Sequence, residues 1–211
     1  MAINVAENLK VLGVECDVMT NDIRPVKTRY IDDISNQMLI RVDEKDEITP
    51  ITQKDLEFFD LKNYIAVIIS DYNKGYLSTE NIKWIAENHP LTFMDTKKSL
   101  DFWCENIKFL KINEKEFNAN EDYLRNYYIG NLIVTRGRDG AYLNYNQHFP
   151  IEEEHDVRDL SGAGDTFLAA HVAKYIENYD ICEAIKFANK CAAWVVTQKG
   201  VVVVDLSKIK L

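Results

Sequence analysis

The sequence predicts an α/β fold, in which a doubly wound, mainly parallel sheet is flanked by helices and accompanied by a small β-hairpin. From about residue 51 onward, apolar runs of strand length alternate with segments of helical periodicity, which is typical of a parallel sheet. Residues 26–32 and 37–43 are two nearly alternating runs around a polar turn, the pattern of a hairpin. The glycine-rich stretch 161–164 leads directly into an apolar segment of helical pattern.

Length and composition indicate one globular domain. The chain has 211 residues, of which 46% are hydrophobic, enough for one α/β domain with a core but not for two large ones. Its formal net charge of −9 argues against nucleic acid or an anionic membrane as the main partner. The start has no basic, apolar leader and no window has the length of a membrane span, so we expect a cytoplasmic protein.

Several common site types find no support in the sequence. The cysteines form no CxxC pair and have no histidine at metal-ligand spacing, so we expect neither a zinc site nor a disulfide framework. We expect these thiols to be reduced and mostly buried: Cys16, Cys104, Cys182 and Cys191. GxxxxGK[ST], GxGxxG and HExxH motifs and a nucleophile elbow are absent, which disfavours the corresponding nucleotide-binding and hydrolase classes.

The chain begins with a predicted helix. Residues 2–12 carry apolar side chains at helical spacing, and Gly13 is a suitable stop. Residues 15–19 then predict a short strand.

The hairpin that follows carries three cations, Lys27, Arg29 and Arg41. Such side chains pair well with phosphate oxygens, so they are candidates to bind a phosphorylated substrate. The alternative is that they solvate an exposed hairpin and discourage pairing at its edges.

Three predicted strands, 64–70, 91–95 and 109–112, are followed by polar residues, and helices are expected at 78–87 and 121–128. The polar stretches after the strands are Asp71–Gly75, Asp95–Lys97 and Asn113–Glu116. Ligands of doubly wound sheets bind beyond the carboxyl ends of the strands, so these stretches are well placed for function. The stretch with Asp71 and Lys74 can also be read as a simple turn.

The later segments complete the alternation. Residues 131–143 predict strand, turn and strand, with Gly137 and Gly140 in the turn. Residues 144–158 are polar and acidic, residues 181–197 predict a helix, and residues 200–204 predict a loop or an edge strand.

The stretch 159–166, Asp-Leu-Ser-Gly-Ala-Gly-Asp-Thr, predicts an anion site. Its glycines allow a sharp turn that points free backbone N–H groups outward at the positive end of a helix. Asp165 would repel a bound anion, which suggests a chemical role: it takes a proton from an attacking hydroxyl while the N–H groups stabilise a transferring phosphoryl group. The alternative is that Asp165 only caps the helix.

The same stretch, followed by small and apolar residues, resembles the C-terminal signature of the ribokinase-like (PfkB) carbohydrate kinases. Residues 24–29 and 36–43 most resemble the branch of D-glycero-β-D-manno-heptose-7-phosphate kinases, the kinase half of a bifunctional ADP-heptose synthesis enzyme. The resemblance implies one ribokinase-like domain over residues 1–211, with a lid at about 24–48 and a core of 1–23 and 49–211. It also implies ATP and Mg²⁺ as cofactors, a sugar phosphate as acceptor, and a possible homodimer through the lid.

The resemblance assigns roles to individual residues. Asp165 is the base, and the N–H groups of Gly162, Ala163 and Gly164 form the anion hole. The substrate residues are Asn4, Lys27, Arg41, Asp71 and Lys74. The nucleotide residues are Asn113, Thr135, Arg136, Gly140, Ser161, Gly162, Gly164 and Asn189.

Asn113 and Glu116 match the Asn-x-x-Glu motif that supports magnesium in these kinases, generally through water. Magnesium prefers oxygen ligands and keeps several waters, so the pair is chemically suitable. The alternative is a helix capping box. For Asn4 the alternative is a helix N-terminal residue, and for Arg136 it is a solvated turn residue.

The sequence departs from the family at its start. The family's opening Gly-Gly-Ala-x-Asn-Val-Ala is matched only by residues 2–6, so we expect the first core strand and the lid strands that follow it to be missing. Thr96 replaces the proline of an Asp-Pro-Lys motif. Two alternatives to a heptose-phosphate kinase therefore stay open: an inactive homologue that binds nucleotide or a partner, and a kinase of another small sugar or a nucleoside.

Overall fold

A six-stranded sheet forms the centre of the computed structural model, which describes residues 2–21, 26–32, 34–35, 37–44, 48–152 and 156–209. Its strands lie side by side in sequence order: β3 (Val67–Asp71), β4 (Thr92–Thr96), β5 (Phe109–Asn113), β6 (Asn131–Thr135), β7 (Ala141–Leu143) and β8 (Gln147–Phe149). The first four strands are parallel, and β7 and β8 are antiparallel to their neighbours. The predicted mainly parallel sheet is confirmed.

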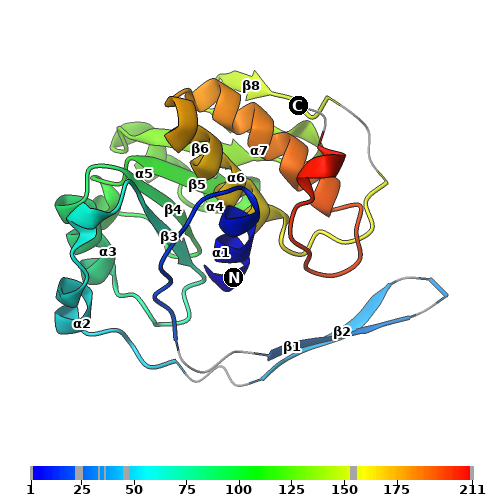
Figure 1. Cartoon of the computed structure of the whole chain (residues 1–211), viewed down its shortest axis with the longest axis horizontal. Helices are drawn as coiled ribbons and strands as arrows, with labels where there is room; N and C mark the ends of the chain where they lie inside the picture. Colours follow the sequence, from blue (N-terminus) through cyan, green and yellow to red (C-terminus); the bar gives the residue numbers. More distant parts are fainter. Residues whose placement is uncertain are drawn as a thin grey trace.

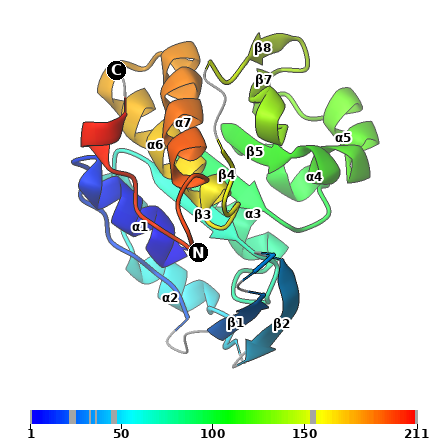
Figure 2. The same ribbon diagram turned by 90° about the vertical axis from the view of Figure 1, so that its right-hand side faces the viewer.

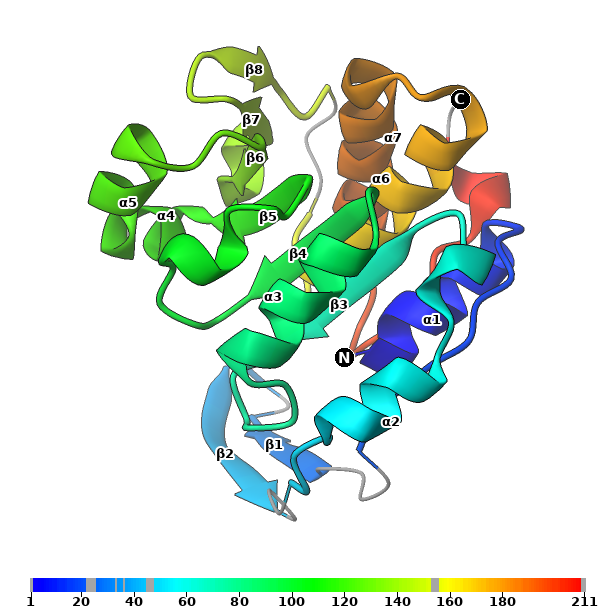
Figure 3. The same ribbon diagram turned by 90° about the vertical axis from the view of Figure 1, so that its left-hand side faces the viewer.

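Helices cover both faces of this sheet, as the doubly wound prediction requires (Figures 2 and 3). The helices are α1 (Ala2–Val11), α2 (Gln53–Phe58), α3 (Thr79–Asn88), α4 (Glu114–Ala119), α5 (Glu121–Asn126), α6 (Ala163–Asn178) and α7 (Ile181–Val195). Side chains of adjacent strand residues point to opposite faces. Phe93 and Phe109 therefore pack with α1 and α6, whereas Met94 and Leu110 pack with α3 and α5. No helix among the described residues is long and apolar enough to cross a membrane.

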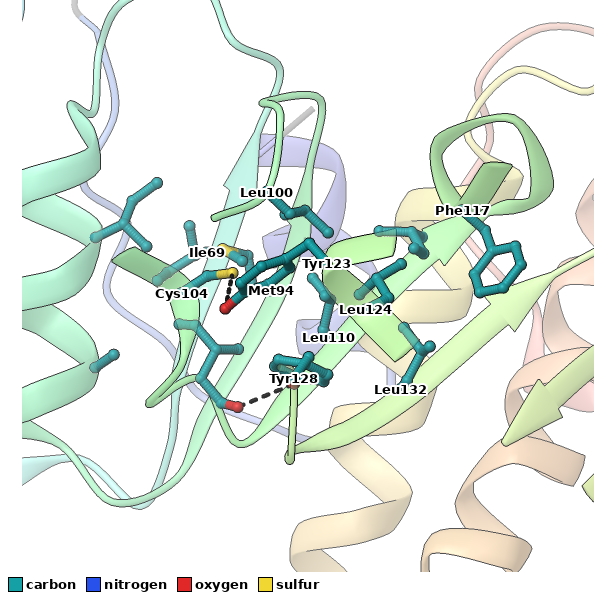
Figure 4. Close-up of a cluster of buried hydrophobic side chains, with 14 of the residues drawn as sticks. Ile69, Met94, Leu100, Cys104, Leu110, Phe117, Tyr123, Leu124, Tyr128 and Leu132 are labelled. Carbon is teal, nitrogen blue, oxygen red and sulfur yellow. Dashed lines mark hydrogen bonds between the residues drawn. The ribbon is translucent and has the colours of Figure 1, made fainter. Parts of the chain in front are cut away.

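The α3 and α5 side of the sheet holds the largest apolar cluster (Figure 4). Met94, Leu110 and Leu124 are fully buried at its centre. The polar atoms at its border are satisfied within the protein: the Tyr128 hydroxyl donates to the Ile107 carbonyl at 3.0 Å. This packing fixes the strands whose carboxyl ends carry the polar residues of the site.

The predicted hairpin is confirmed as β1 (Val26–Ile31) paired with β2 (Met38–Glu44), and it extends away from the sheet and helices (Figure 1). Many of its apolar side chains are exposed, among them Tyr30, Ile31, Met38, Leu39 and Ile40. Other residues of the expected lid lie outside the described residues, including Arg24, Pro25, Asp33 and Asn36.

Three expectations about elements need correction. Residues 15–19 are a loop and not a strand; they form no backbone ladder, and a side-chain bond from the Tyr64 hydroxyl to Asp17 holds them instead. β3 begins at Val67 and not at residue 64, because a 3-10 turn at Leu61–Asn63 precedes it. β8 lies inside the stretch 144–158, where polarity alone gave no strand signal, and it forms by pairing with β7.

The edge of β3 that faces away from β4 is open. Val67 donates its N–H to Leu91 and Asp71 accepts from Lys97, so the backbone groups of alternate residues point toward β4. Those of Ile68 and Ser70 consequently point to the other side, where the described residues place no paired strand. A groove of about 390 Å³ lies beside this edge, lined mainly by apolar residues of α1, of the loop 14–19 and of residues 64–70.

His171 of α6 is buried among aromatic rings at the sheet, with ring centroids 5.5 Å from Phe93 and 5.6 Å from Phe109. Its Nε2 has no hydrogen-bond partner among the described residues. Burial lowers the pKa of His171 from 6.5 to about 3. The folded protein therefore holds this ring neutral at pH values where the unfolded chain binds a proton.

We expect His171→Leu to reduce the acid sensitivity of the fold. In the parent protein the unfolded state takes up a proton as pH falls below 6.5 and the folded state does not, so stability falls with pH. This cost is about 2 kcal/mol between pH 7 and pH 5, and the variant should lose that much less in urea titrations. His148, which is exposed, is the control as His148→Gln. Equal pH dependence in His171→Leu and the parent protein would contradict the prediction.

Candidate active site

The glycine-rich turn is placed at the start of α6, as predicted. Gly162 is the N-cap, with a left-handed backbone at φ 86° that favours glycine. A Cβ at this residue would lie 3.1 Å from the Asn4 amide nitrogen and 3.2 Å from Val201 Cγ1. The first-turn N–H groups have no acceptors within the helix. Ala163 donates its N–H to the Leu160 carbonyl at 3.4 Å, a long contact, and the start of a helix is a suitable place for an anion.

Asp165 lies in this first turn and is 1% exposed. Its Oδ2 accepts from the Asn4 amide at 3.0 Å, and its Oδ1 accepts from the Tyr72 hydroxyl at 3.2 Å. Burial raises the pKa of Asp165 above the usual aspartate value. Its carboxylate is thus held in place by two neutral donors and is a stronger proton acceptor than an exposed aspartate.

Asn4 is fixed in turn by Asn8, one helical turn along α1. The Asn8 amide donates to the Asn4 carbonyl at 2.8 Å, and the Asn8 side-chain oxygen accepts from the Val204 N–H at 3.0 Å. Asn8 itself is fully buried. The helix that begins the chain is therefore tied both to the base and to the segment after α7.

A row of alternating charges runs from the turn along the carboxyl ends of β4 and β5. Lys111 Nζ lies 2.5 Å from Asp95 Oδ2, and Asp95 Oδ1 lies 3.7 Å from Lys97 Nζ. Lys97 also forms a close ion pair with Glu116. Lys97 and Lys27 of the hairpin both lie over the Tyr72 ring, at 5.6 and 5.7 Å from its centroid.

Asn113 and Glu116 form the capping box of α4, the alternative that the sequence left open for this pair. The Asn113 side chain accepts from the Glu116 N–H at 2.9 Å, and Glu116 accepts from the Asn113 N–H at 2.9 Å. The capping role does not exclude a role toward metal, because carboxylate oxygens can accept further hydrogen bonds.

The other predicted substrate residues have different surroundings. Asp71, at the end of β3, is buried, and its carboxylate accepts from the Asn73 N–H and the Thr96 hydroxyl and pairs with Lys98 at 3.3 Å. Lys74 is exposed in the loop after β3. Arg41 pairs with Asp43 on its own strand at 2.9 Å.

The predicted nucleotide residues lie at the ends of β5 and β6 and on α7. Thr135 ends β6 with its hydroxyl on the Ile112 carbonyl at 3.3 Å, and Arg136 lies over the Tyr142 ring. Gly140 has φ 83°, and a Cβ there would meet the Phe149 carbonyl oxygen at 2.2 Å, so the tight turn requires glycine.

Asn189 lines a small cavity of about 110 Å³ with Pro150, Ile151 and Trp194. Its amide donates to the Phe149 carbonyl at 2.8 Å. Ser161 is positioned by Asp159, which accepts from the N–H groups of both Ser161 and Gly200, at 2.8 and 3.1 Å.

Buried or half-buried residues of this region that were not assigned a site role include Asn8, Tyr72, Asp95, Lys98 and Lys111. Lys111 had a signal, since it is a charged residue inside an apolar strand sequence. Tyr72 and Lys98 adjoin strand ends that were expected to carry function. Asn8 had no distinguishing signal, because a polar residue in an amphipathic helix is ordinarily on the solvent side.

Comparisons with known proteins give matches in both sequence and structure. Residues 78–208 match the family described as pfkB family carbohydrate kinase. The chain is 32% identical to the bifunctional protein HldE of a Nitratiruptor species, over 87% of this chain and 44% of that protein. It is 28% identical to the HldE protein of Helicobacter acinonychis, over 100% and 57%. The chain thus spans about half the length of the curated relatives it matches.

Solved structures have the same fold. Ribokinase from Thermotoga maritima superposes with a TM-score of 0.71 at 20% identity, covering 94% of this chain and 81% of that one. Ribokinase of Arabidopsis thaliana in complex with ribose and ATP gives 0.67 at 18% identity, covering 89% and 69%. These superpositions confirm the predicted ribokinase-like fold.

We expect Gly162→Ala to destabilise the protein more than Gly13→Ala. Both glycines have left-handed backbones, at φ 86° and 80°, so either alanine costs about 1 kcal/mol of strain. Only the alanine at 162 also presses on Asn4 and Val201, whereas nothing lies within 4 Å of a Cβ at 13. Urea unfolding should show an additional loss of about 1 kcal/mol or more for Gly162→Ala. Equal losses would show that the turn does not depend on this close approach.

Proposed function

We propose that this chain, which belongs to the pfkB family of carbohydrate kinases, transfers the γ-phosphoryl group of ATP to a hydroxyl of a sugar phosphate, with heptose 7-phosphate as the acceptor and heptose 1,7-bisphosphate as the product. The observation that carries the proposal is the buried Asp165 carboxylate at the glycine-rich start of α6. A hydroxyl nucleophile needs a proton acceptor, and a transferring phosphoryl group needs fixed positive partners. This turn supplies both within one helical turn.

In the proposed reaction, Asp165 accepts the proton of the attacking hydroxyl. Asn4 and Tyr72 hold its two oxygens, so that a lone pair stays directed into the site. The N–H groups of Gly162, Ala163 and Gly164 stabilise charge on the phosphoryl oxygens as it develops. Because burial raises the pKa of Asp165, the carboxylate is better matched to proton transfer near neutral pH than an exposed aspartate is.

Asn113 and Glu116 are suited to magnesium as supports through water. The side-chain atoms that they could offer to a metal are oxygens, which magnesium prefers. These oxygens are already engaged in the capping box or with Lys97. Magnesium would supply charge neutralisation for the ATP phosphates. Among the described residues, no group of three or more His, Cys, Asp or Glu side chains could hold a metal ion.

For ATP, we assign the phosphates to the carboxyl ends of β5 and β6, near Thr135, Arg136, Gly140 and Ser161, and the base to the side of Asn189. Two facts support this assignment: strand carboxyl ends are where doubly wound sheets bind ligands, and a ribokinase of this fold was solved with ATP. Arg136 is half-exposed, lies over the Tyr142 ring and faces Glu114 at 3.4 Å, so it would have to leave Glu114 to reach a phosphate.

The acceptor proposal rests on the hairpin and on the HldE relatives. Lys27, which touches the Tyr72 ring, brings a cation from the hairpin toward the residue that holds Asp165. With Asn4, Asp71, Lys74 and Arg41, it belongs to the set that we assign to the sugar phosphate. The exposed apolar side chains of the hairpin support a dimer through this element.

A second candidate function is binding of nucleotide or of a partner without transfer. The observation that favours it is the open edge of β3 beside an apolar groove, since an unpaired sheet edge is ordinarily covered.

Asp165→Asn should abolish product formation. The amide keeps the shape of the side chain but cannot accept the hydroxyl proton, so we expect turnover to fall by about 10²–10⁴-fold. The measurement is mass spectrometry of phosphorylated products from Mg-ATP and a panel of sugars, sugar phosphates and nucleosides that includes heptose 7-phosphate. Glu177→Gln, the same chemical change near the exposed end of α6, is the control and should keep parent activity.

The panel of acceptors distinguishes the two candidate functions and the candidate acceptors. Product from heptose 7-phosphate that disappears in Asp165→Asn supports the proposal, whereas product from a different acceptor alone replaces the heptose assignment. ATP binding by a folded protein without product from any acceptor would refute the kinase proposal in favour of the second candidate.

A further inference from the structure

Lys111 is a buried lysine inside the apolar strand β5. Its side chain is 5% exposed, and its neighbours in the strand, Leu110 and Ile112, are fully buried. Its close acidic partner is Asp95 Oδ2, on the adjacent strand β4. Burying a lysine costs free energy that a single ion pair does not reliably offset. Its placement therefore calls for an explanation beyond strand packing.

The position of the ammonium relative to α6 supplies one. A Cβ built on Gly164 would lie 3.0 Å from Lys111 Nζ and 3.8 Å from Asp95 Oδ2. The ammonium thus lies directly against the first turn of α6, and the missing side chain at 164 makes room for it. Strand β5 and helix α6, which are distant in sequence, approach closely here because Gly164 has no side chain.

We propose, on the basis of the kinase function proposed above, that Lys111 supplies a fixed positive charge beneath the phosphoryl-binding turn at residues 162–164 and thereby binds the phosphoryl group that ATP donates. The start of a helix already carries a partial positive charge, so a cation placed beside it is unfavourable in the empty protein. The same arrangement becomes favourable when an anion occupies the turn. A fixed charge in such a water-poor site acts more strongly than one on the surface.

Asp95 holds this charge in place without cancelling it fully. Its Oδ1 has no hydrogen-bond partner among the described residues and faces Lys97 at 3.7 Å. Asp95 therefore stands between two ammonium groups, of which Lys97 is also paired with Glu116. An incoming phosphoryl group would be a second anionic partner for the Lys111 ammonium, while Asp165 stays bonded to Asn4 and Tyr72.

The competing explanation is that the Lys111 pair only ties β4 to β5. The ladder between these strands joins Phe93 to Phe109 and Met94 to Leu110, so a tie near their carboxyl ends would be useful. The two explanations differ in what each partner contributes. If the ion pair only joins the two strands, removing either Lys111 or Asp95 breaks it equally. A charge that binds the phosphoryl group is lost only when Lys111 is removed.

The test compares Lys111→Met with Asp95→Asn in the full chain. The affinities of ATP and of inorganic phosphate are measured by calorimetry and by ³¹P NMR titration. We expect Lys111→Met to weaken the binding of both probes about tenfold or more, which is the range for a charge-assisted contact. Asp95→Asn, which keeps the ammonium, should weaken both much less. Lys108→Met, at the exposed residue just before β5, should leave both affinities unchanged.

If Lys111→Met and Asp95→Asn weaken ATP and phosphate binding equally, the proposal is overturned and the ion pair only joins the two strands. Weakening of heptose 7-phosphate binding with unchanged ATP and phosphate binding would overturn it as well. If Lys111→Met does not fold, the charge-balanced pair Lys111→Met with Asp95→Asn is used; it should bind phosphate more weakly than Asp95→Asn alone. These binding measurements do not need turnover, so a parent protein that transfers no phosphoryl group would refute the proposed kinase function and still leave the role of Lys111 decidable.

Discussion

The hydrogen bonds to Asp165 are the interaction on which the rest of the site depends. One oxygen of this buried carboxylate is held from α1 by Asn4 and the other from the loop after β3 by Tyr72, while the residue itself belongs to α6. Three elements from both ends of the chain therefore converge on one side chain. Each bond is made by a neutral donor, so the carboxylate is oriented without an ion pair that would weaken it as a base.

The charges beside this carboxylate alternate along the ends of β4 and β5. The first turn of α6 and Lys111 and Lys97 carry positive charge; Asp95 separates the two ammonium groups, and Glu116 pairs with Lys97. Such a cluster is expensive to hold in a folded protein and is typical of functional sites, where stability is given up for ligand binding. Gly162 and Gly164 make it possible, one through its left-handed backbone and the other through its missing Cβ.

The sequence predicted the fold and the turn of the site because both depend on local patterns. Alternating apolar runs predicted β3 to β6, and the glycine spacing predicted the start of α6. The strand predicted at residues 15–19 was wrong because a strand needs a partner, and the short apolar pattern says nothing about whether one is present. β8 was missed for the complementary reason, since pairing with β7 overrides its polar composition.

The contacts within the site were less accessible to sequence reasoning. The bond between Asn4 and Asp165 joins residues 161 positions apart, and no local pattern encodes it. The resemblance named Asn4 as a substrate residue, whereas its visible contact is with the proposed base. The closeness of Lys111 to Gly164 depends on how α6 crosses the sheet, which only packing determines.

The strand order has a consequence for how the protein folds. Each strand from β4 to β8 pairs with the strand that precedes it in the chain, so the sheet can grow by successive addition of neighbours. The site cannot form in this way, because α6 comes after the last strand and must meet α1 from the start of the chain. During synthesis the sheet can be built before the glycine-rich turn exists, and a nascent chain that ends before α6 would have the sheet without the candidate site. Formation of the candidate site is therefore a late event in folding, because it waits for the synthesis of α6.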